Sequence, residues 1–202
     1  MDKNSYALGM SIAHNMVSSG IKNFNFEDLT AGMKAVLDGT EPEVSFKEAA
    51  ELLDKYFAQI EEEAKKEAAK MAEIFKKQGE DFLAENAKKE GVKVLPSGLQ
   101  YKVIKEGSGK KPAATDQVKC HYEGTFIDGT KFDSSYDRNE PATFGLNMVI
   151  PGWTEGLQLM SEGSKYELYI PYQLGYGEMG AQGAIPPCAA LIFTVELIEV
   201  LG

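Results

Sequence analysis

The stretch FDSSYDRN, residues 132–139, contains the one arginine among the 21 lysine and arginine residues of the chain. This arginine, Arg138, follows Asp133 by five positions. Lysine presents a point charge, whereas the flat guanidinium of arginine can grip a carboxylate through two parallel hydrogen bonds. The use of arginine here, with lysine everywhere else, predicts a geometric role for Arg138 rather than a role in charge alone.

The other residues that could do chemistry form no recognisable reactive arrangement. The sequence contains no Ser/His/Asp or Cys/His arrangement, no phosphate loop of the G-x-x-x-x-G-K type and no carboxylate cluster that suggests a metal. Cys120 and Cys188 lie far apart and form no CxxC, and His14 and His121 occur in unrelated contexts. We therefore expect neither a metal nor a cofactor.

Alternation in the run VKCHYEGTF predicts a strand that buries one of its faces. Val118, Cys120, Tyr122 and Phe126 fall on that face, and polar residues occupy the other. Cys120 is then a small core residue, and His121 is a solvated residue on the outer face. Neither is expected to take part in chemistry.

The composition is that of an acidic globular protein. Its 202 residues suffice for one or two domains, and 43% of them are hydrophobic. The formal net charge is −10 and both halves are acidic, so we expect no nucleic-acid partner. The N-terminus lacks a signal-peptide pattern and no apolar run is long enough to insert into a membrane, which predicts a cytoplasmic protein, or a periplasmic or envelope protein if a signal peptide was removed.

Residues 1–90 show the periodicity of helices. The pattern predicts one helix over Ser5–Ser18 and a second that begins after Asn25, a suitable N-cap, and stops at Gly39. Both short helices have apolar faces, and a unit as small as residues 1–44 rarely folds alone. We therefore expect residues 1–44 to form a helical dimerisation region of a homodimer.

A third, much longer helix is predicted over residues 45–90. Ser45 and Glu48 form an S-x-x-E capping box, and no proline interrupts the chain until Pro96. The apolar stripe of this helix thins after Phe75, where charged residues and alanine dominate. Helices this polar usually bridge domains through solvent, although folding back onto the C-terminal half remains an alternative.

Residues 91–202 change to a pattern of strands and turns. Asp128-Gly129 marks a tight hairpin, and only the stretch entered through Pro151-Gly152 suggests a short helix. The pattern predicts an antiparallel sheet packed on one helix. The whole chain is thus expected to be of the α+β class, with an all-α region first and the sheet domain last.

The C-terminal half is rich in aromatic residues near glycine and proline turns. Its runs VKCHYEGTFIDGTKFDSSYDR, MVIPGWTEGLQLM and LGYGEMGAQGAIPPCAALIFTVELIEV occur in the order found in the FKBP-type peptidyl-prolyl cis-trans isomerases, which this half resembles from about residue 95 to the end. The helical half resembles the dimerising region of the macrophage-infectivity-potentiator-like subfamily of bacteria. The fold implied is the FKBP-like sheet wrapped on a short helix.

The resemblance also implies which residues form the site. Trp153 matches the floor of the family's pocket, and Arg138 matches an arginine that locks the Asp133 carboxylate and its loop. The Ile150 amide and the Tyr176 hydroxyl match donors to a bound carbonyl. By motif match the catalytic residues are Asp133, Tyr176, Phe193, Trp153 and Tyr122, and the substrate-binding residues are Phe132, Arg138, Phe144, Val149, Ile150 and Ile185.

The implied activity is rotation of Xaa-Pro bonds in proteins, with unfolded or flexible proline-containing chains as partners and macrolide immunosuppressants as inhibitors. No cofactor is implied. A second interpretation, a chaperone or adaptor that uses the pocket only to bind, stays open at this point.

Overall fold

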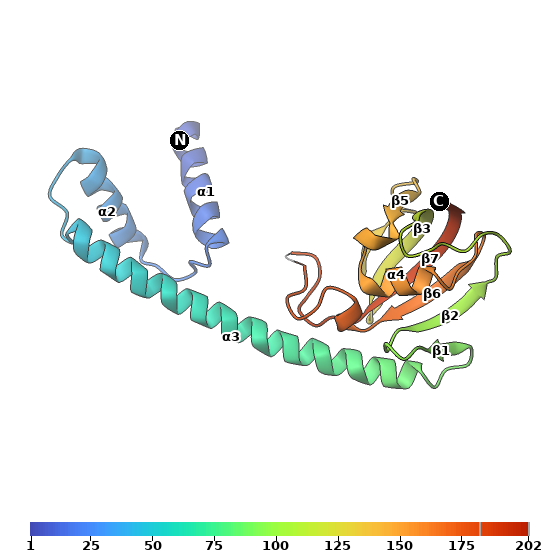
Figure 1. Cartoon of the computed structure of the whole chain (residues 1–202). Helices are drawn as coiled ribbons and strands as arrows, with labels where there is room; N and C mark the ends of the chain where they lie inside the picture. The colour runs from blue at the N-terminus through green and yellow to red at the C-terminus, as the bar shows by residue number, and fades with distance from the viewer. Residues whose placement is uncertain (182, 202) are drawn as a thin grey trace. The chain divides into compact units, whose positions relative to one another are not determined.

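A computed structural model describes residues 1–181 and 183–201 of the chain. Contacts divide the chain into two compact units, residues 1–67 and residues 68–202. The first unit is helical, and the second combines the end of a long helix with an antiparallel sheet (Figure 1). The predicted α+β class is confirmed.

Side-chain caps set the starts of the three N-terminal helices. These are α1 (Lys3–Ser18), α2 (Phe26–Asp38) and α3 (Phe46–Asn86). As predicted, Asn25 caps α2 by accepting the Glu27 amide at 2.8 Å, and Gly39 ends it in the left-handed conformation. The predicted start of α1 is two residues late, because Asp2 accepts the amides of the first turn and caps the helix earlier.

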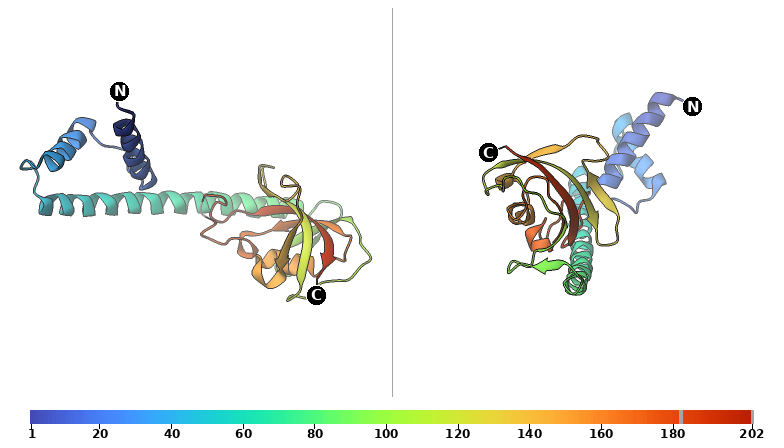
Figure 2. Two further views of the ribbon diagram at one scale, coloured as in Figure 1. Left: turned by 90° about the horizontal axis from the view of Figure 1, so that it is seen from above. Right: turned by 90° about the vertical axis from the view of Figure 1, so that its right-hand side faces the viewer.

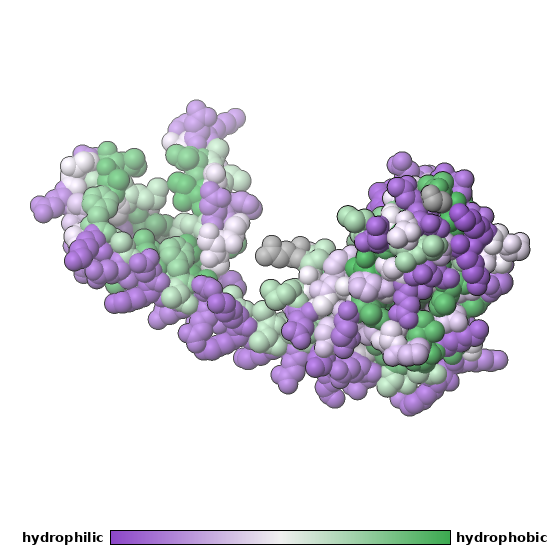
Figure 3. Space-filling model, in the orientation of Figure 1, coloured by the Kyte–Doolittle hydropathy of each residue, from purple (hydrophilic) through white to green (hydrophobic). Residues whose placement is uncertain are grey.

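The short helices of the first unit leave their apolar faces uncovered. Neither α1 nor α2 contains a fully buried residue. Hydrophobic side chains gather over both helices (Figure 3). The exposed large hydrophobic residues of the two helices are Tyr6, Leu8, Met10, Val17, Phe26, Met33, Val36 and Leu37.

The part of α3 from Ala68 to Asn86 belongs to the second unit and packs on it. Phe75 lies against the hydrophobic core, and Gly79 is buried beside Ala190. A Cβ atom at Gly79 would lie only 2.9 Å from the Ala190 side chain, so glycine is what permits this approach. The expectation that this part of α3 bridges through solvent is therefore wrong. The apolar pattern of the helix did not predict the contact, because the contact is made at a glycine, which does not extend the apolar stripe.

A buried amide pair holds the end of α3 in place. Asn86 is fully buried and donates to the Gln100 side chain at 3.0 Å, and Gln100 donates in turn to the Leu83 carbonyl at 2.8 Å. Each of the two amides thus donates one hydrogen bond, whereas among the described residues the buried Asn86 Oδ1 has no partner. Within the described residues no helix combines the length and apolarity needed to span a bilayer.

The strands of the described residues form one seven-stranded antiparallel sheet. Its order is β1-β2-β6-β7-β3-β4, and β5 also pairs with β3. The Asp128-Gly129 turn joins β3 to β4 as predicted, with Gly129 at a positive φ of 86°. The strands are β1 (Val92–Val94), β2 (Gln100–Lys105), β3 (Gln117–Phe126), β4 (Lys131–Ser134), β5 (Ala142–Gly145), β6 (Lys165–Ile170) and β7 (Leu191–Val200).

The core of the second unit lies between this sheet and α4 (Pro151–Leu157), which covers one face of it (Figure 2). Short 3-10 turns at Leu146–Met148 and Tyr172–Leu174 lead into and out of this region. Cys120 is fully buried on the inner face of β3, as predicted, and burial raises the pKa of its thiol to about 12. The thiol is therefore protonated and unreactive at neutral pH.

Candidate active site

An aromatic cavity opens beside α4, where the inner face of the sheet meets the 3-10 turn before the helix. Its volume is about 490 Å³. Strands β3, β4, β5 and β7 supply part of its wall, and the segment from Leu146 to α4 supplies much of the rest. The lining residues are Tyr122, Phe132, Asp133, Phe144, Met148, Val149, Ile150, Trp153, Tyr176 and Phe193.

The register of three strands builds the inner wall of this cavity. Asp133 on β4 lies opposite Gly124 on β3, and Gly124 lies opposite Phe193 on β7. Because Gly124 has no side chain, the rings of Phe132 and Phe193 meet edge to face with centroids 5.5 Å apart. A Cβ at Gly124 would lie 2.7 Å from Phe132 and 2.8 Å from Phe193. Sequence reasoning missed this residue, although a glycine inside a strand pattern signals such a close approach.

Trp153 forms the floor of the cavity and is held by three aromatic neighbours. Its ring lies nearly perpendicular to those of Tyr122, Phe144 and Phe193, with centroid distances of 5.2, 5.5 and 5.3 Å. The indole is only 4% exposed. Within the described residues its Nε1 has no hydrogen-bond partner, which fits a surrounding made of ring edges and faces.

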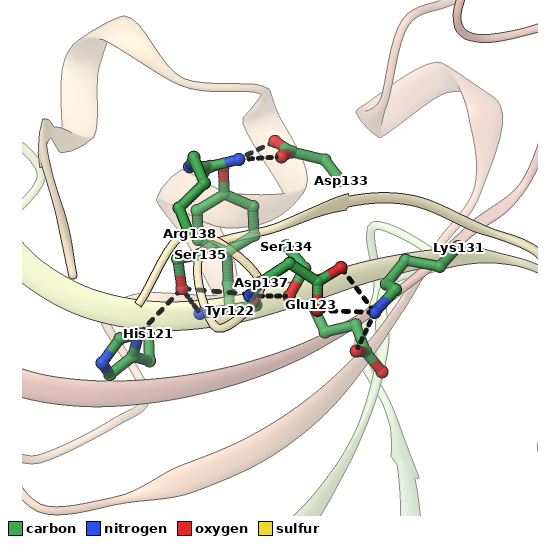
Figure 4. Close-up of polar contacts among 9 residues, drawn as sticks. All are labelled: His121, Tyr122, Glu123, Lys131, Asp133, Ser134, Ser135, Asp137 and Arg138. Carbon is green, nitrogen blue, oxygen red and sulfur yellow. Dashed lines mark hydrogen bonds and ion pairs between the residues drawn. The ribbon is translucent and has the colours of Figure 1, made fainter. Parts of the chain in front are cut away.

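A triangle of hydrogen bonds joins Tyr122, Asp133 and Arg138 at one edge of the cavity (Figure 4). The Tyr122 hydroxyl donates to Asp133 Oδ2 at 2.5 Å. Arg138 donates from one terminal nitrogen to Asp133 Oδ1 at 2.6 Å and from the other to the Tyr122 oxygen at 2.8 Å. The guanidinium group thus bonds two residues, one through each terminal nitrogen. The expectation of two parallel hydrogen bonds from Arg138 to the Asp133 carboxylate is therefore wrong.

The triangle keeps Asp133 ionised and Tyr122 protonated at neutral pH. Partial burial alone would raise the pKa of the Asp133 carboxyl, but the hydrogen bonds from Tyr122 and Arg138 and the charge of Arg138 outweigh burial and hold this pKa below its usual value. Burial, with the carboxylate as hydrogen-bond acceptor, raises the pKa of Tyr122. Asp133 therefore presents a fixed negative charge at the rim of an apolar cavity.

Two possible hydrogen-bond donors lie on the other side of the cavity. Within the described residues the Ile150 amide, just before α4, donates to no protein acceptor. Burial and the charge of Asp133 raise the pKa of Tyr176, so its half-exposed hydroxyl keeps its proton. Both groups are free to donate to a carbonyl that enters the cavity.

Nine of the eleven residues named from the sequence lie together in the cavity lining. Arg138 lies outside the lining and reaches it through Asp133 and Tyr122. Ile185 does not line the cavity: it is 6% exposed, belongs to the hydrophobic core and pairs with Ala181 in an isolated bridge. Met148 lines the cavity with an 83% exposed side chain, and no pattern in the sequence pointed to it.

His121 is not the solvated residue that strand alternation predicts. It is half-buried, its Nδ1 lies 2.9 Å from the Ser135 hydroxyl, and its ring stacks on Tyr136 at 4.6 Å. Alternation places His121 on the outer face correctly, but the chain after β4 returns to cover it. Among the described residues no three His, Cys, Asp or Glu side chains are grouped closely enough to hold a metal ion.

Comparison with known families matches nearly the entire chain. Residues 108–198 match the family described as FKBP-type peptidyl-prolyl cis-trans isomerase. Residues 1–103 match the family described as the domain amino terminal to FKBP-type peptidyl-prolyl isomerase. The two matches together cover both units of the structure.

Individual relatives match this chain over almost its full length. The chain is 50% identical to the FKBP-type isomerase FkpA of Aeromonas hydrophila, covering 98% of this chain and 76% of that protein. It is 45% identical to the FKBP-type 22 kDa isomerase of Escherichia coli K12, covering 98% and 94%, and 42% identical to the outer membrane protein MIP of Legionella longbeachae, covering 98% and 85%.

A solved structure gives the same result for the fold. The crystal structure of FkpA from Escherichia coli superimposes with a TM-score of 0.76 at 37% identity, covering 98% of this chain and 95% of that one. Matches of this extent include the cavity and the helical first unit together. The chain belongs to the FKBP-type peptidyl-prolyl cis-trans isomerases, enzymes that rotate the peptide bond before proline.

Proposed function

We propose that the proline of a substrate enters the aromatic cavity over Trp153 and that its peptide bond rotates there, beside the Tyr122, Asp133 and Arg138 triangle. The observation that carries this proposal is an apolar cavity of about 490 Å³ with one ordered carboxylate at its rim. The rings of Tyr122, Phe132, Phe144 and Phe193 surround the floor. Such a site removes water from a prolyl ring and leaves polar contacts only at its edge.

Rotation needs no nucleophile, because the barrier is one of resonance. Twisting an amide breaks its partial double bond and costs roughly 18–20 kcal/mol. At the halfway twist the nitrogen is pyramidal and the carbonyl is less polarised, so this species suits an apolar surrounding better than the planar amide does. Each 1.4 kcal/mol or so of preferential binding to the twisted form accelerates rotation about tenfold.

The polar groups then orient the peptide instead of exchanging protons with it. The Ile150 amide and the Tyr176 hydroxyl donate to substrate carbonyls and hold the chain on either side of the rotating bond. Asp133 acts electrostatically, with its charge facing the carbonyl carbon as the bond twists. Its lowered pKa supports this role, because a carboxyl that stays ionised is a poor proton donor at neutral pH.

A peptide assay tests the assignment of the site. Isomerisation of a Xaa-Pro peptide is measured for the wild-type chain and for Phe132→Ala, with Phe82→Ala, an aromatic residue of α3 outside the cavity, as matched control. We expect Phe132→Ala to lower kcat/KM about tenfold or more and the control to stay within about twofold. Equal losses in both variants would contradict the assignment.

The same cavity is the proposed site of inhibition by macrolide immunosuppressants. The chain has one tryptophan, Trp153, so its fluorescence reports directly on the cavity floor. A macrolide that binds there should change this fluorescence and suppress isomerisation at the same concentrations. Fluorescence and activity that respond at different concentrations would place the macrolide elsewhere.

The helical unit is proposed to join two chains into a homodimer. Its support is the uncovered apolar surface of α1 and α2, including Leu8, Phe26 and Leu37, on a unit too small to bury a core alone. A dimer carries two cavities, and binding a flexible client at two points raises avidity without new contacts. Sedimentation of the full chain should give the dimer mass, and Phe26→Glu with Leu37→Glu should shift it to the monomer; a wild-type monomer would refute the proposal.

The proposed location is the cell envelope. The cytoplasmic alternative finds no support among the relatives described above, one of which is called an outer membrane protein. Cell fractionation with an antibody against the chain tests the location. Recovery with cytoplasmic markers alone would favour the cytoplasmic alternative.

A further inference from the structure

The segment that follows β4 crosses the edge of β3 and places side chains on both of its faces. Strand β3 pairs with β4 at Glu123 and beyond, and with β5 up to Cys120. His121 and Tyr122 therefore have no strand partner on that side. Ser135 fills the gap, Tyr136 after it lies on the outer face, and Arg138 reaches the cavity face.

Ser135 acts as a substitute for the missing strand residue. Its side chain is fully buried. Its hydroxyl accepts the Tyr122 amide at 2.7 Å, and its own amide donates to the Tyr122 carbonyl at 2.9 Å. The backbone of the residue that carries the catalytic phenol is thus tied directly to the segment that carries Asp133 and Arg138.

On the outer face the same segment is held by a second set of contacts. The Tyr136 ring stacks on His121 at 4.6 Å with 13° between the planes, and its hydroxyl donates to Glu196 of β7 at 3.0 Å. Lys165 of β6 lies 5.3 Å from the centroid of the Tyr136 ring and 3.8 Å from the Glu196 carboxylate. Burial and the bond to Glu196 raise the pKa of Tyr136 to about 12, so its hydroxyl keeps its proton at neutral pH.

We propose that His121, Ser135 and Tyr136 form an outer clamp that positions Arg138 and Asp133 for isomerisation. In Figure 4 the Ser135 hydroxyl contacts both the His121 ring and the Tyr122 amide. The clamp residues are positioning residues, because they reach the cavity only through Tyr122 and the 133–138 segment. The inference rests on the cavity being the site of rotation, as proposed above.

The outer contacts are needed because the two residues of this segment that face the cavity, Asp133 and Arg138, are half exposed. The side chains of Arg138 and Asp133 are 51% and 41% exposed, so their mutual contact alone is screened by water and holds the segment weakly. Stacking on His121 and the bond to Glu196 fix the same segment from the less exposed side. Removing them should let the carboxylate and guanidinium move without disturbing the floor at Trp153.

The test compares Tyr136→Ala and Tyr136→Phe with a matched control. Tyr166→Phe removes the same kind of bond, a tyrosine hydroxyl donating to the carboxylate of Glu106, at a site outside the cavity lining. We expect Tyr136→Ala to lower kcat about five- to tenfold with KM little changed, Tyr136→Phe to lose less because it keeps the stack, and Tyr166→Phe to match wild type. Unchanged kcat in Tyr136→Ala would overturn the proposal.

A double-mutant cycle separates positioning from a general loss of structure. If Tyr136 acts through Arg138 and Asp133, then Tyr136→Ala should lower kcat by a smaller factor in the Arg138→Ala background than in the wild type. Full additivity of the two losses, or an equal loss of kcat in Tyr166→Phe, would show a structural effect and refute the clamp. If Tyr136→Ala does not fold, Tyr136→Phe carries the same cycle. Wild-type turnover and the Phe132→Ala variant, measured in the same assay, show independently whether the cavity is the site of rotation.

Discussion

Tyr122 donates a hydrogen bond from its hydroxyl to Asp133 at 2.5 Å, although the two residues lie eleven positions apart in the sequence. Arg138 closes the triangle by donating to both of them. The carboxylate is therefore oriented by two partners, one rigid and ring-bearing and one cationic. A change at any corner removes two of the three hydrogen bonds, so the effects of substitutions here should not be additive.

Arg138→Lys should lower activity even though it conserves charge. A lysine ammonium can reach either Asp133 or Tyr122, but it cannot span both as the guanidinium fork does. We expect kcat/KM for a Xaa-Pro peptide to fall about tenfold, equivalent to about 1.4 kcal/mol. As control, Lys131→Arg changes a nearby cation outside the triangle, which bonds Asp137, and should leave kcat/KM unchanged. Activity equal to wild type in Arg138→Lys would contradict the geometric role.

Asp133→Asn should change how the free energy of unfolding depends on pH. The pKa of Asp133 is lower in the folded protein than in the unfolded chain, so the ionised carboxylate stabilises the fold at pH values above the usual carboxyl range. That contribution disappears as the pH falls through the lowered folded value, where the group takes up a proton. Urea unfolding from pH 7 to pH 2 should therefore show wild type more stable at the upper end and equal to Asp133→Asn at the lower end. A constant difference over the whole range would count against the linkage.

Tyr122→Phe should raise the pKa of the Asp133 carboxyl. The Tyr122 hydroxyl stabilises the ionised form, and phenylalanine keeps the ring packed on Trp153 while removing that hydrogen bond. An NMR titration of the Asp133 carboxyl carbon in both proteins measures the change directly. A pKa that stays at the wild-type value would mean that Arg138 alone sets it. Rotation should slow by roughly three- to tenfold, since one orienting partner remains.

Gly79→Leu should destabilise the second unit although leucine is the better helix former. The added side chain meets Ala190 at its first carbon, so α3 must move away from the sheet or strain its neighbours. We expect a loss of about 1–3 kcal/mol in unfolding free energy, monitored by Trp153 fluorescence in urea. Gln78→Leu, at the exposed neighbouring position, is the control and should not destabilise. Equal stability of the two variants would show that the contact between α3 and Ala190 is dispensable.

Local patterns predicted the elements whose causes are local. Asn25 and Gly39 delimit α2 because a cap and a left-handed turn act within a few residues. Alternation placed Cys120 and Tyr122 on the inner face of β3 because the period of a strand is a property of its own backbone. Local patterns did not predict contacts between segments far apart in the sequence, such as the packing of α3 on Ala190 through Gly79.

The sequence by itself determined the class of the fold, the order of its motifs and most of the aromatic residues that now line one cavity. Only the tertiary structure decided that Arg138 divides its fork between Asp133 and Tyr122, that Ile185 belongs to the core and that His121 is covered by Tyr136. Residue types and spacings specify what each side chain can bond. Which partner it meets depends on strand register and on the return of the chain across β3, and these are set by packing between segments far apart in the sequence.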